Sequence, residues 1–169
     1  ERNPNLEVFK KNDIEVLYFF DPADDFIISA LGTYKEKAIK SIDQADLGSI
    51  DKKEEKSKEE NKEDIQKVEK FVEYAKDFLK DKVKEVRKSN RLTDSPVCLV
   101  NPDNTTSTQM QKMMKMLNKD FEMPKKIFEI NYDSPLIKNL AELHSKNNNK
   151  EYLDQCIMQL FDNALMLDG

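Results

Sequence analysis

The stretch VKEVRKSNRLTDSPVCLVN, residues 83–101, contains two short segments of strand-forming side chains. These segments cover residues 83–89 and 96–101, and the intervening RLTDSP has the composition of a turn. A third segment of the same kind, KKIFEIN, occupies residues 125–131. Three short strands predict a small sheet, which needs helices packed on it to bury its apolar side chains.

Helices are predicted before, between and after these strands. From residue 64 to residue 79, apolar side chains recur at steps of three and four, as in an amphipathic helix. Further helices are predicted at residues 107–117, with Thr106 or Ser107 as the cap, and at residues 135–145 and 150–167. The order α-β-β-α-β-α-α predicts an α+β domain with a three-stranded, mainly antiparallel sheet surrounded by helices.

The first 46 residues have the pattern of a smaller αβαβ unit. NLEVFKK is predicted to be helical, and the apolar run IEVLYFF at residues 14–20 has the composition and length of a strand. A helix is expected to start at Asp21, which can cap it, and to stop at Gly32. A second strand is expected at residues 38–42.

A charged stretch separates the two units. Residues 51–64, DKKEEKSKEENKED, contain no apolar side chain, which is typical of a solvated connection or an exposed helix start. We therefore divide the chain into residues 1–46, a connection at 47–64, and a second domain at 65–169.

The composition excludes several classes of function. The 169 residues carry a net charge of −5, which does not favour nucleic-acid binding. No apolar run approaches the roughly 20 residues of a membrane span, and no apolar signal segment begins the sequence. Two cysteines without a CxxC motif and one histidine indicate a reducing compartment, hence the cytoplasm, and argue against a zinc site. Three glycines cannot form a phosphate-binding glycine loop.

Catalysis by these residues is not expected. Asp21, Asp24 and Asp25 follow an apolar run, where carboxylates can hold Mg²⁺ for phosphoryl transfer, but a helix start needs the same residues. His144 lies at a helix end, and one histidine with two scattered cysteines, Cys98 and Cys156, gives little material for a nucleophile–base arrangement. We therefore predict no catalytic residue and no metal ligand, and keep a Mg²⁺-dependent phosphoryl-transfer domain as the alternative.

Residues 107–121 hold four of the seven methionines. Met110, Met113, Met114 and Leu117 lie at i, i+3, i+4 and i+7, so they share one helix face, and Met116 lies off it. Spacing alone favours the core face of an amphipathic helix. The alternative is an adaptable apolar surface for partners, because methionine is flexible and fits many shapes.

The last predicted helix has the seam of a coiled coil. Its apolar residues step by four and three, and others widen the seam; together they are Leu153, Cys156, Ile157, Leu160, Phe161, Ala164, Leu165 and Leu167. An apolar face this broad must be buried by packing against other elements on more than one side. Burial within one chain and pairing with a second copy are both open, and a purely structural dimerisation module is a further alternative.

Several segments resemble the heat-shock protein 90 family of chaperones, most closely its bacterial members. NPNLEVFKKNDIEVLYFFDPADDF resembles the end of the family's middle domain. Three later segments resemble the family's C-terminal domain: RLTDSPVCLVNPDNTTSTQMQKMMKM, KKIFEINYDSPLIKNLAEL and LFDNALMLDG. The segments match in the right order and cover nearly the whole chain except the charged connection. Asp13 stands where relatives usually have glycine, and Tyr132 where they have proline.

The resemblance implies a homodimer that holds unfolded or partly folded client proteins. It places ATP and Mg²⁺ in an N-terminal domain outside these residues, so no cofactor is expected here. It also implies a client-binding helix with Met110, Met113, Met114 and Leu117 exposed. The implied dimerisation residues are Leu153, Cys156, Ile157, Leu160, Phe161, Ala164 and Leu167. A second bundle helix would follow residue 169, so a weakened dimer is expected.

Overall fold

The computed structural model describes residues 3–21, 23–44, 62–103, 105–146 and 149–168. The first part of the chain contains η1 (Pro4–Leu6), α1 (Glu7–Lys11), α2 (Asp24–Leu31), β1 (Thr33–Tyr34) and β2 (Lys37–Ala38). The second part contains α3 (Lys62–Leu79), β3 (Glu85–Lys88), β4 (Val97–Val100), α4 (Thr108–Leu117), β5 (Ile127–Ile130), α5 (Pro135–Ser145) and α6 (Lys150–Leu167). The predicted order α-β-β-α-β-α-α is confirmed. Most of the charged connection lies outside the described residues, and residues 62–64 begin α3.

The second part is built on a sheet with the strand order β3-β5-β4. The central strand β5 is antiparallel to β4 and parallel to β3, while β1 and β2 form a separate antiparallel hairpin. Two of the three strand pairs are therefore antiparallel, and the α+β class is confirmed. The parallel pair arises because β5 lies between β3 and β4, which run in opposite directions, so β5 must be parallel to one of them.

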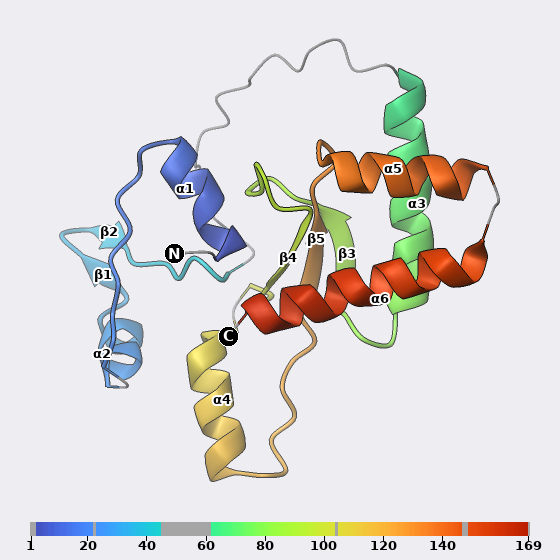
Figure 1. Ribbon diagram of the computed structural model, residues 1–169. Helices are drawn as coiled ribbons and strands as arrows, with labels where there is room; N and C mark the ends of the chain where they lie inside the picture. Colours follow the sequence, from blue (N-terminus) through green and yellow to red (C-terminus); the bar gives the residue numbers. More distant parts are fainter. Residues whose placement is uncertain (1–2, 22, 45–61, 104, 147–148, 169) are drawn as a thin grey trace.

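One face of the three-stranded sheet carries the main core. Val97 and Leu99 of β4 and Phe128 and Ile130 of β5 are buried with the apolar sides of α3, α5 and α6. Figure 1 shows these three helices lying together on that side of the sheet, with α6 crossing in front of it. Because strand side chains alternate between faces, Cys98 lies in a separate cluster on the other face.

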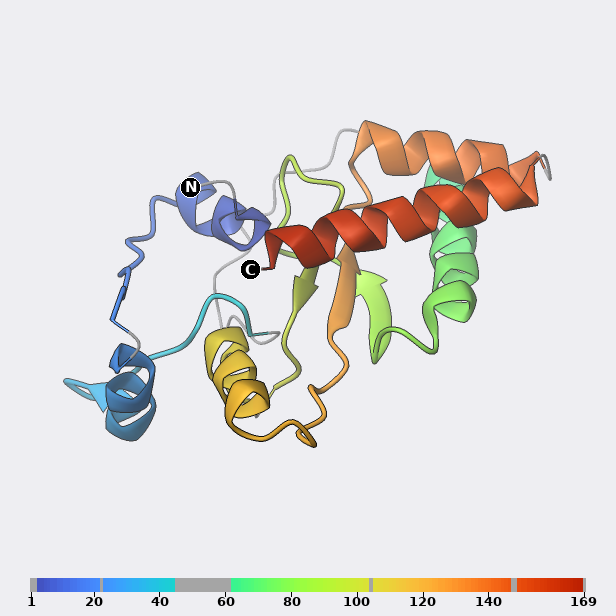
Figure 2. The same cartoon turned by 60° about the horizontal axis from the view of Figure 1, so that its bottom comes forward.

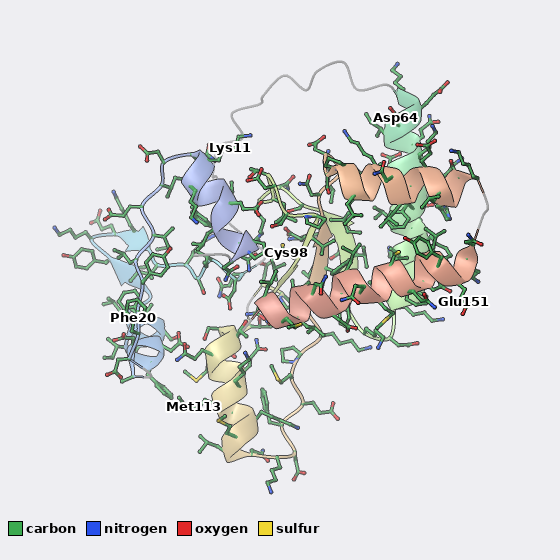
Figure 3. All side chains as sticks on the ribbon, viewed as in Figure 1. Lys11, Phe20, Asp64, Cys98, Met113 and Glu151 are labelled. Carbon is green, nitrogen blue, oxygen red and sulfur yellow. The ribbon has the colours of Figure 1, made fainter. Side chains whose placement is uncertain are left out.

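The predicted strand at residues 14–20 is wrong. These residues have no regular secondary structure, and most of their apolar side chains are exposed; Phe20, labelled in Figure 3, is 88 % exposed. Strand-forming side chains alone do not make a segment a strand, because the backbone of a strand also needs a neighbouring strand as its hydrogen-bond partner. Of the strand predicted at residues 38–42, only Ala38 is in a strand, as the second residue of β2.

The helix predicted in NLEVFKK and the stop of the next helix at Gly32 are confirmed, but the predicted cap Asp21 is wrong, because Ala23 is the N-cap of α2. α2 has Asp24 and Asp25 in its first turn and ends at Gly32, whose φ of 60° suits glycine. The helix begins later than expected, because the Asp21 carboxylate accepts a hydrogen bond from the Ala23 amide in the preceding turn. Asp13 has a φ of 55°, in the left-handed region that glycine and, less often, aspartate adopt.

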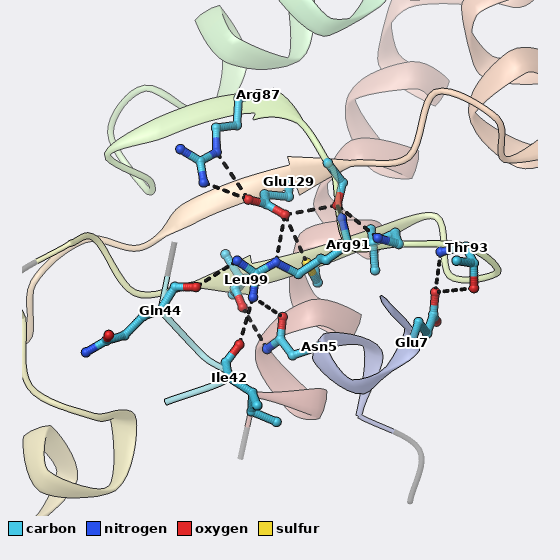
Figure 4. A network of polar contacts seen from close by, with 12 residues as sticks. Asn5, Glu7, Ile42, Gln44, Arg87, Arg91, Thr93, Leu99 and Glu129 are labelled. Atoms are coloured by element: carbon cyan, nitrogen blue, oxygen red, sulfur yellow. Dashed lines mark hydrogen bonds and ion pairs between the residues drawn. The ribbon is translucent and has the colours of Figure 1, made fainter. Parts of the chain in front are cut away.

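A buried carboxylate on β5 joins all three strands of the sheet (Figure 4). Glu129 is 3 % exposed and pairs with Arg87 of β3, at 2.8 Å, and with Arg91, at 3.1 Å. The Ser89 hydroxyl also donates to Glu129, and the Cys98 thiol of β4 lies 3.9 Å from it. Burial is the main cause that raises the pKa of the Cys98 thiol, so this side chain stays protonated.

Arg91 extends this arrangement to the first part of the chain. Its guanidinium donates at 2.7 Å to the carbonyl oxygens of both Ile42 and Gln44, and it also contacts the Asn5 side chain. Arg91 is itself 1 % exposed, so each of these bonds is made out of reach of bulk water. Since a buried guanidinium must keep its partners, residues 42 and 44 are held against the sheet.

A second polar contact fastens α1 to the loop before β4. The Glu7 carboxylate accepts hydrogen bonds from the backbone amides of Thr93, Asp94 and Ser95. Burial alone would raise the pKa of Glu7, but hydrogen bonds from Ser95 and from these amides hold it below its usual value of 4.5.

Arg91→Met should remove the buried ion pair while keeping most of the side-chain volume. We expect it to lower the free energy of unfolding by about 3–5 kcal/mol, because Glu129 loses a buried partner and two carbonyl oxygens lose their donor. Arg87→Met, at a position one-third exposed, should cost only about 1 kcal/mol. Urea unfolding of both variants measures this difference, and equal losses would contradict the account.

Glu7→Gln should destabilise the chain in a pH-dependent manner. Because the pKa of Glu7 is lower in the folded chain than its usual 4.5, its carboxylate contributes stability above that pH. This contribution is lost as the pH falls through the lowered value. Urea unfolding should show a deficit for the variant at pH 7 that shrinks as the pH is lowered below 4.5, whereas a deficit that stays constant down to the acid limit of folding would refute this role.

Candidate functional site

α4 stands apart from the helices of the main core. In Figures 1 and 2 it lies at the opposite end of the sheet from α3, near the end of α6. Ser107 is its N-cap, as predicted: the Ser107 hydroxyl accepts a hydrogen bond from the Met110 amide and donates to Asp25 at 2.6 Å. The helix start is therefore tied to α2.

The first turn of α4 is anchored by buried polar groups. The Asp43 carboxylate accepts hydrogen bonds from the amide and hydroxyl of Thr108, at 3.0 and 2.9 Å, and from the Asn101 amide group, at 2.8 Å. The Gln111 side chain, which is fully buried, donates to the carbonyl oxygen of Thr106. These contacts fix the first turn on the end of β4.

Lys126, just before β5, connects this anchor to the end of α6. Its ammonium group donates to the Thr108 hydroxyl at 2.7 Å and pairs with Asp168 at 2.5 Å. Burial is the largest influence on Asp168 and raises its pKa, although the hydrogen bond and charge of Lys126 oppose the rise. The start of α4 and the end of α6 thus share one buried cation.

The apolar side chains of α4 differ in exposure along the helix. Met110 is 8 % exposed, Met113 is half-buried, Met114 is 39 % exposed, and Leu117 is 83 % exposed (Figure 3 labels Met113). The expected solvent exposure of Met110 is therefore wrong, because the anchored first turn presses it against its own domain. The later positions extend beyond that anchor into solvent.

Two exposed methionines were not among the predicted site residues. Met116 is 84 % exposed and Met123, in the chain after α4, is 40 % exposed. We call these two residues, with Met114 and Leu117, the Met surface; they are the exposed apolar side chains in the second half of α4 and the chain after it. Helical spacing places Met116 off the apolar face, so periodicity gives no signal for it. The density of methionine in residues 107–123 is the signal that could have found both residues.

Most of the predicted dimerisation residues lie in the chain's own core. Five of the seven are buried between α6 and the sheet and its helices: Leu153, Ile157, Leu160, Phe161 and Ala164. Cys156 is half-buried, and Leu167 is 47 % exposed. The expectation that this seam is open to a second copy is therefore wrong for the five buried residues, because the sheet and its helices already cover them.

α6 has a different apolar surface. Tyr152 is 54 % exposed, Leu165 is 46 % exposed and Met166 is 81 % exposed. These residues and Leu167 lie toward the two ends of the helix, and the exposed positions between them are Gln155, Gln159, Asp162 and Asn163, of which one is charged. An exposed face with few charges is suited to contact with another protein.

The residues considered for chemistry have other roles. Asp24 accepts a hydrogen bond from the Asp21 amide, and Asp25 accepts one from Ser107, so both carboxylates stabilise local structure. His144 lies against the rings of Phe71 and Tyr74, with centroid distances of 6.3 and 4.9 Å. Among the described residues, no group of three or more His, Cys, Asp or Glu side chains is arranged to hold a metal ion.

No helix within the described ranges is both long and apolar enough to cross a membrane.

Comparison with known proteins accounts for the whole chain. A family model described as Hsp90 protein matches residues 1–169. The chain is 38 % identical over 172 residues to Chaperone protein HtpG of Oleidesulfovibrio alaskensis, covering 99 % of this chain and 27 % of that protein. It is 39 % identical to Chaperone protein HtpG of Chlorobaculum tepidum, covering 99 % and 26 %.

A third relative, Chaperone protein HtpG of Geobacter sulfurreducens, is 34 % identical over 171 residues, covering 100 % of this chain and 26 % of that protein. The chain thus spans about a quarter of the length of the curated relatives it matches. With a family match along its full length and several relatives above 30 % identity, the chain belongs to the Hsp90 family.

Proposed function

We propose that this chain is the client-binding and dimerisation part of an ATP-dependent molecular chaperone of the cytoplasm. It holds unfolded or partly folded proteins and takes no part in catalysis itself. ATP and Mg²⁺ act elsewhere in the complete protein, and these residues need no cofactor. The observation that carries the proposal is the Met surface, in which Met116 and Leu117 are more than four-fifths exposed.

The Met surface is unusual for the surface of a folded domain. Single exposed apolar side chains are common, but neighbouring ones cost hydration free energy and favour association. Here four lie within ten residues, in the second half of α4 and the chain after it, and the start of this helix is fastened by buried polar groups. A rigid base with flexible thioether side chains at the tip can contact many different apolar segments, which suits an unfolded client.

Dimerisation is proposed to use the outer side of α6. Leu165, Met166 and Leu167 are all close to half exposed or more, at the end of the helix nearest α4. A second copy packed there would bury these side chains without disturbing the core residues on the inner side. It would also bring two Met surfaces toward one space between the subunits.

Replacing Met116 and Leu117 by serine should remove client binding without affecting the fold. Both side chains are exposed, so we expect the free energy of unfolding to change by less than about 0.5 kcal/mol. Suppression of aggregation of a denatured protein, measured by light scattering, should fall strongly.

Two controls make this experiment specific. Leu136→Ser removes a side chain that is 47 % exposed on α5 and should leave suppression unchanged. Met110→Ala should cost about 2–5 kcal/mol because Met110 is buried. Full suppression by the Met116 and Leu117 double variant would refute the Met surface as the client-binding site.

Leu165→Lys combined with Met166→Lys should weaken self-association. Two charges on the outer side of α6 would have to be desolvated in the dimer, whereas the monomer keeps them in water. Sedimentation at micromolar concentration should show a shift toward monomer, with the circular dichroism spectrum unchanged. Gln159→Lys, between the apolar ends of the helix, tests how far the contact extends. An unchanged dimer in the double variant would exclude this surface.

A further inference from the structure

Residues far apart in the sequence meet at the first turn of α4. Asp43 comes from the chain after β2, Asn101 follows β4, Thr108 begins α4, and Lys126 precedes β5. We call these four residues the joint. Its centre is the Thr108 hydroxyl, which donates to Asp43 and accepts hydrogen bonds from Lys126 at 2.7 Å and Asn101 at 3.1 Å. One donor and two acceptor positions exhaust what a hydroxyl can offer.

The backbone reinforces the same connection. The Asn101 amide donates to the carbonyl oxygen of Asp43 at 2.6 Å, and Gln44 forms a parallel bridge with Asn101. On the other side, Arg91 holds the carbonyl oxygens of Ile42 and Gln44. The segment at residues 41–44 therefore cannot move relative to the sheet without disturbing both the buried ion pair and the first turn of α4.

Not every polar atom at the joint has a hydrogen-bond partner. Asp43 Oδ1 is buried without a hydrogen-bond partner among the described residues, and so is Oε1 of the adjoining Gln111. Unpaired buried acceptors destabilise a folded chain, so a cluster that served stability alone would be better paired or apolar. Opening the cluster breaks no protein hydrogen bond at these two oxygens and lets water reach them.

We propose that the joint couples the position of the first part of the chain to the direction of the Met surface. Asp43 is the positioning residue: displacement of residues 41–44 withdraws its carboxylate from Thr108 and releases the first turn of α4. Met116 and Leu117 then lose their fixed direction. Because coupling free energies are reciprocal, a client that holds α4 also favours one position of residues 41–44. This inference rests on the proposed function for its consequence, but not for the coupling itself.

Hydrogen exchange measured by mass spectrometry tests the coupling in both directions. Asp43→Ala should speed exchange of the α4 first-turn amides by about tenfold or more, because their local opening becomes easier. Thr108→Val should speed exchange of the Asn101 amide, which donates to Asp43. Amides of α3 serve as an internal reference, so global unfolding is recognised by a parallel rise there. In that event Asp43→Asn, which keeps one acceptor oxygen, replaces the alanine variant.

Glu7→Gln is the matched control. Glu7 also joins the first part of the chain to the second through several hydrogen bonds, but it binds the loop at residues 93–95. The Glu7→Gln variant should speed hydrogen exchange of the amides in that loop and leave exchange of the α4 amides unchanged. Unchanged α4 exchange in the Asp43 variant, or an equal rise in α4 with Glu7→Gln, would overturn the proposal.

Binding of a fluorescent unfolded peptide separates this inference from the proposed function. Asp43→Ala should weaken peptide binding about tenfold although Met116 and Leu117 are present, which corresponds to about 1.4 kcal/mol. If the unaltered chain binds no peptide, the proposed function fails while the exchange data still decide the coupling. If the Asp43 variant binds as well as the unaltered chain, the joint does not position the Met surface.

Discussion

Glu129 on the central strand of the sheet and Arg91 after β3 form a buried ion pair, and the positions of the other parts follow from it. Neither side chain is more than 3 % exposed, so each charge depends on its protein partners. Arg91 also donates hydrogen bonds to the carbonyl oxygens of residues 42 and 44, so it connects the sheet to the first part of the chain. Asp43 is thereby brought to the start of α4, which is fastened there while the rest of the helix extends into solvent.

The local pattern of the sequence was sufficient for most elements of the second part. The predicted ranges of α5 and α6 agree with the structure, since both have a clear apolar periodicity and a distinct start. The same reasoning fails at residues 14–20, because strand propensity describes the side chains and not the presence of a partner strand. It also cannot find the joint: Asp43 and Thr108 are separated by 65 positions, and no local spacing relates them.

The candidate site shows a related limit. Periodicity correctly groups Met110, Met113, Met114 and Leu117 on one face, but it does not say where along the helix the neighbouring domain ends. Met110, the first of these residues, is therefore buried, whereas Leu117, the last, is exposed. For α6, steps of three and four arise equally when a helix packs on its own sheet and when it packs on a second copy. Only the fold shows that the sheet occupies the inner side.

The account depends on an unfolded chain contacting the exposed end of α4 and not its anchored start. Site-specific photo-crosslinking tests this most directly, with the crosslinking group placed in turn at positions 110, 116 and 117 and a denatured protein as the client. The account predicts strong crosslinks from positions 116 and 117 and almost none from position 110. Equal yields at all three positions, or crosslinks from position 110 alone, would contradict it.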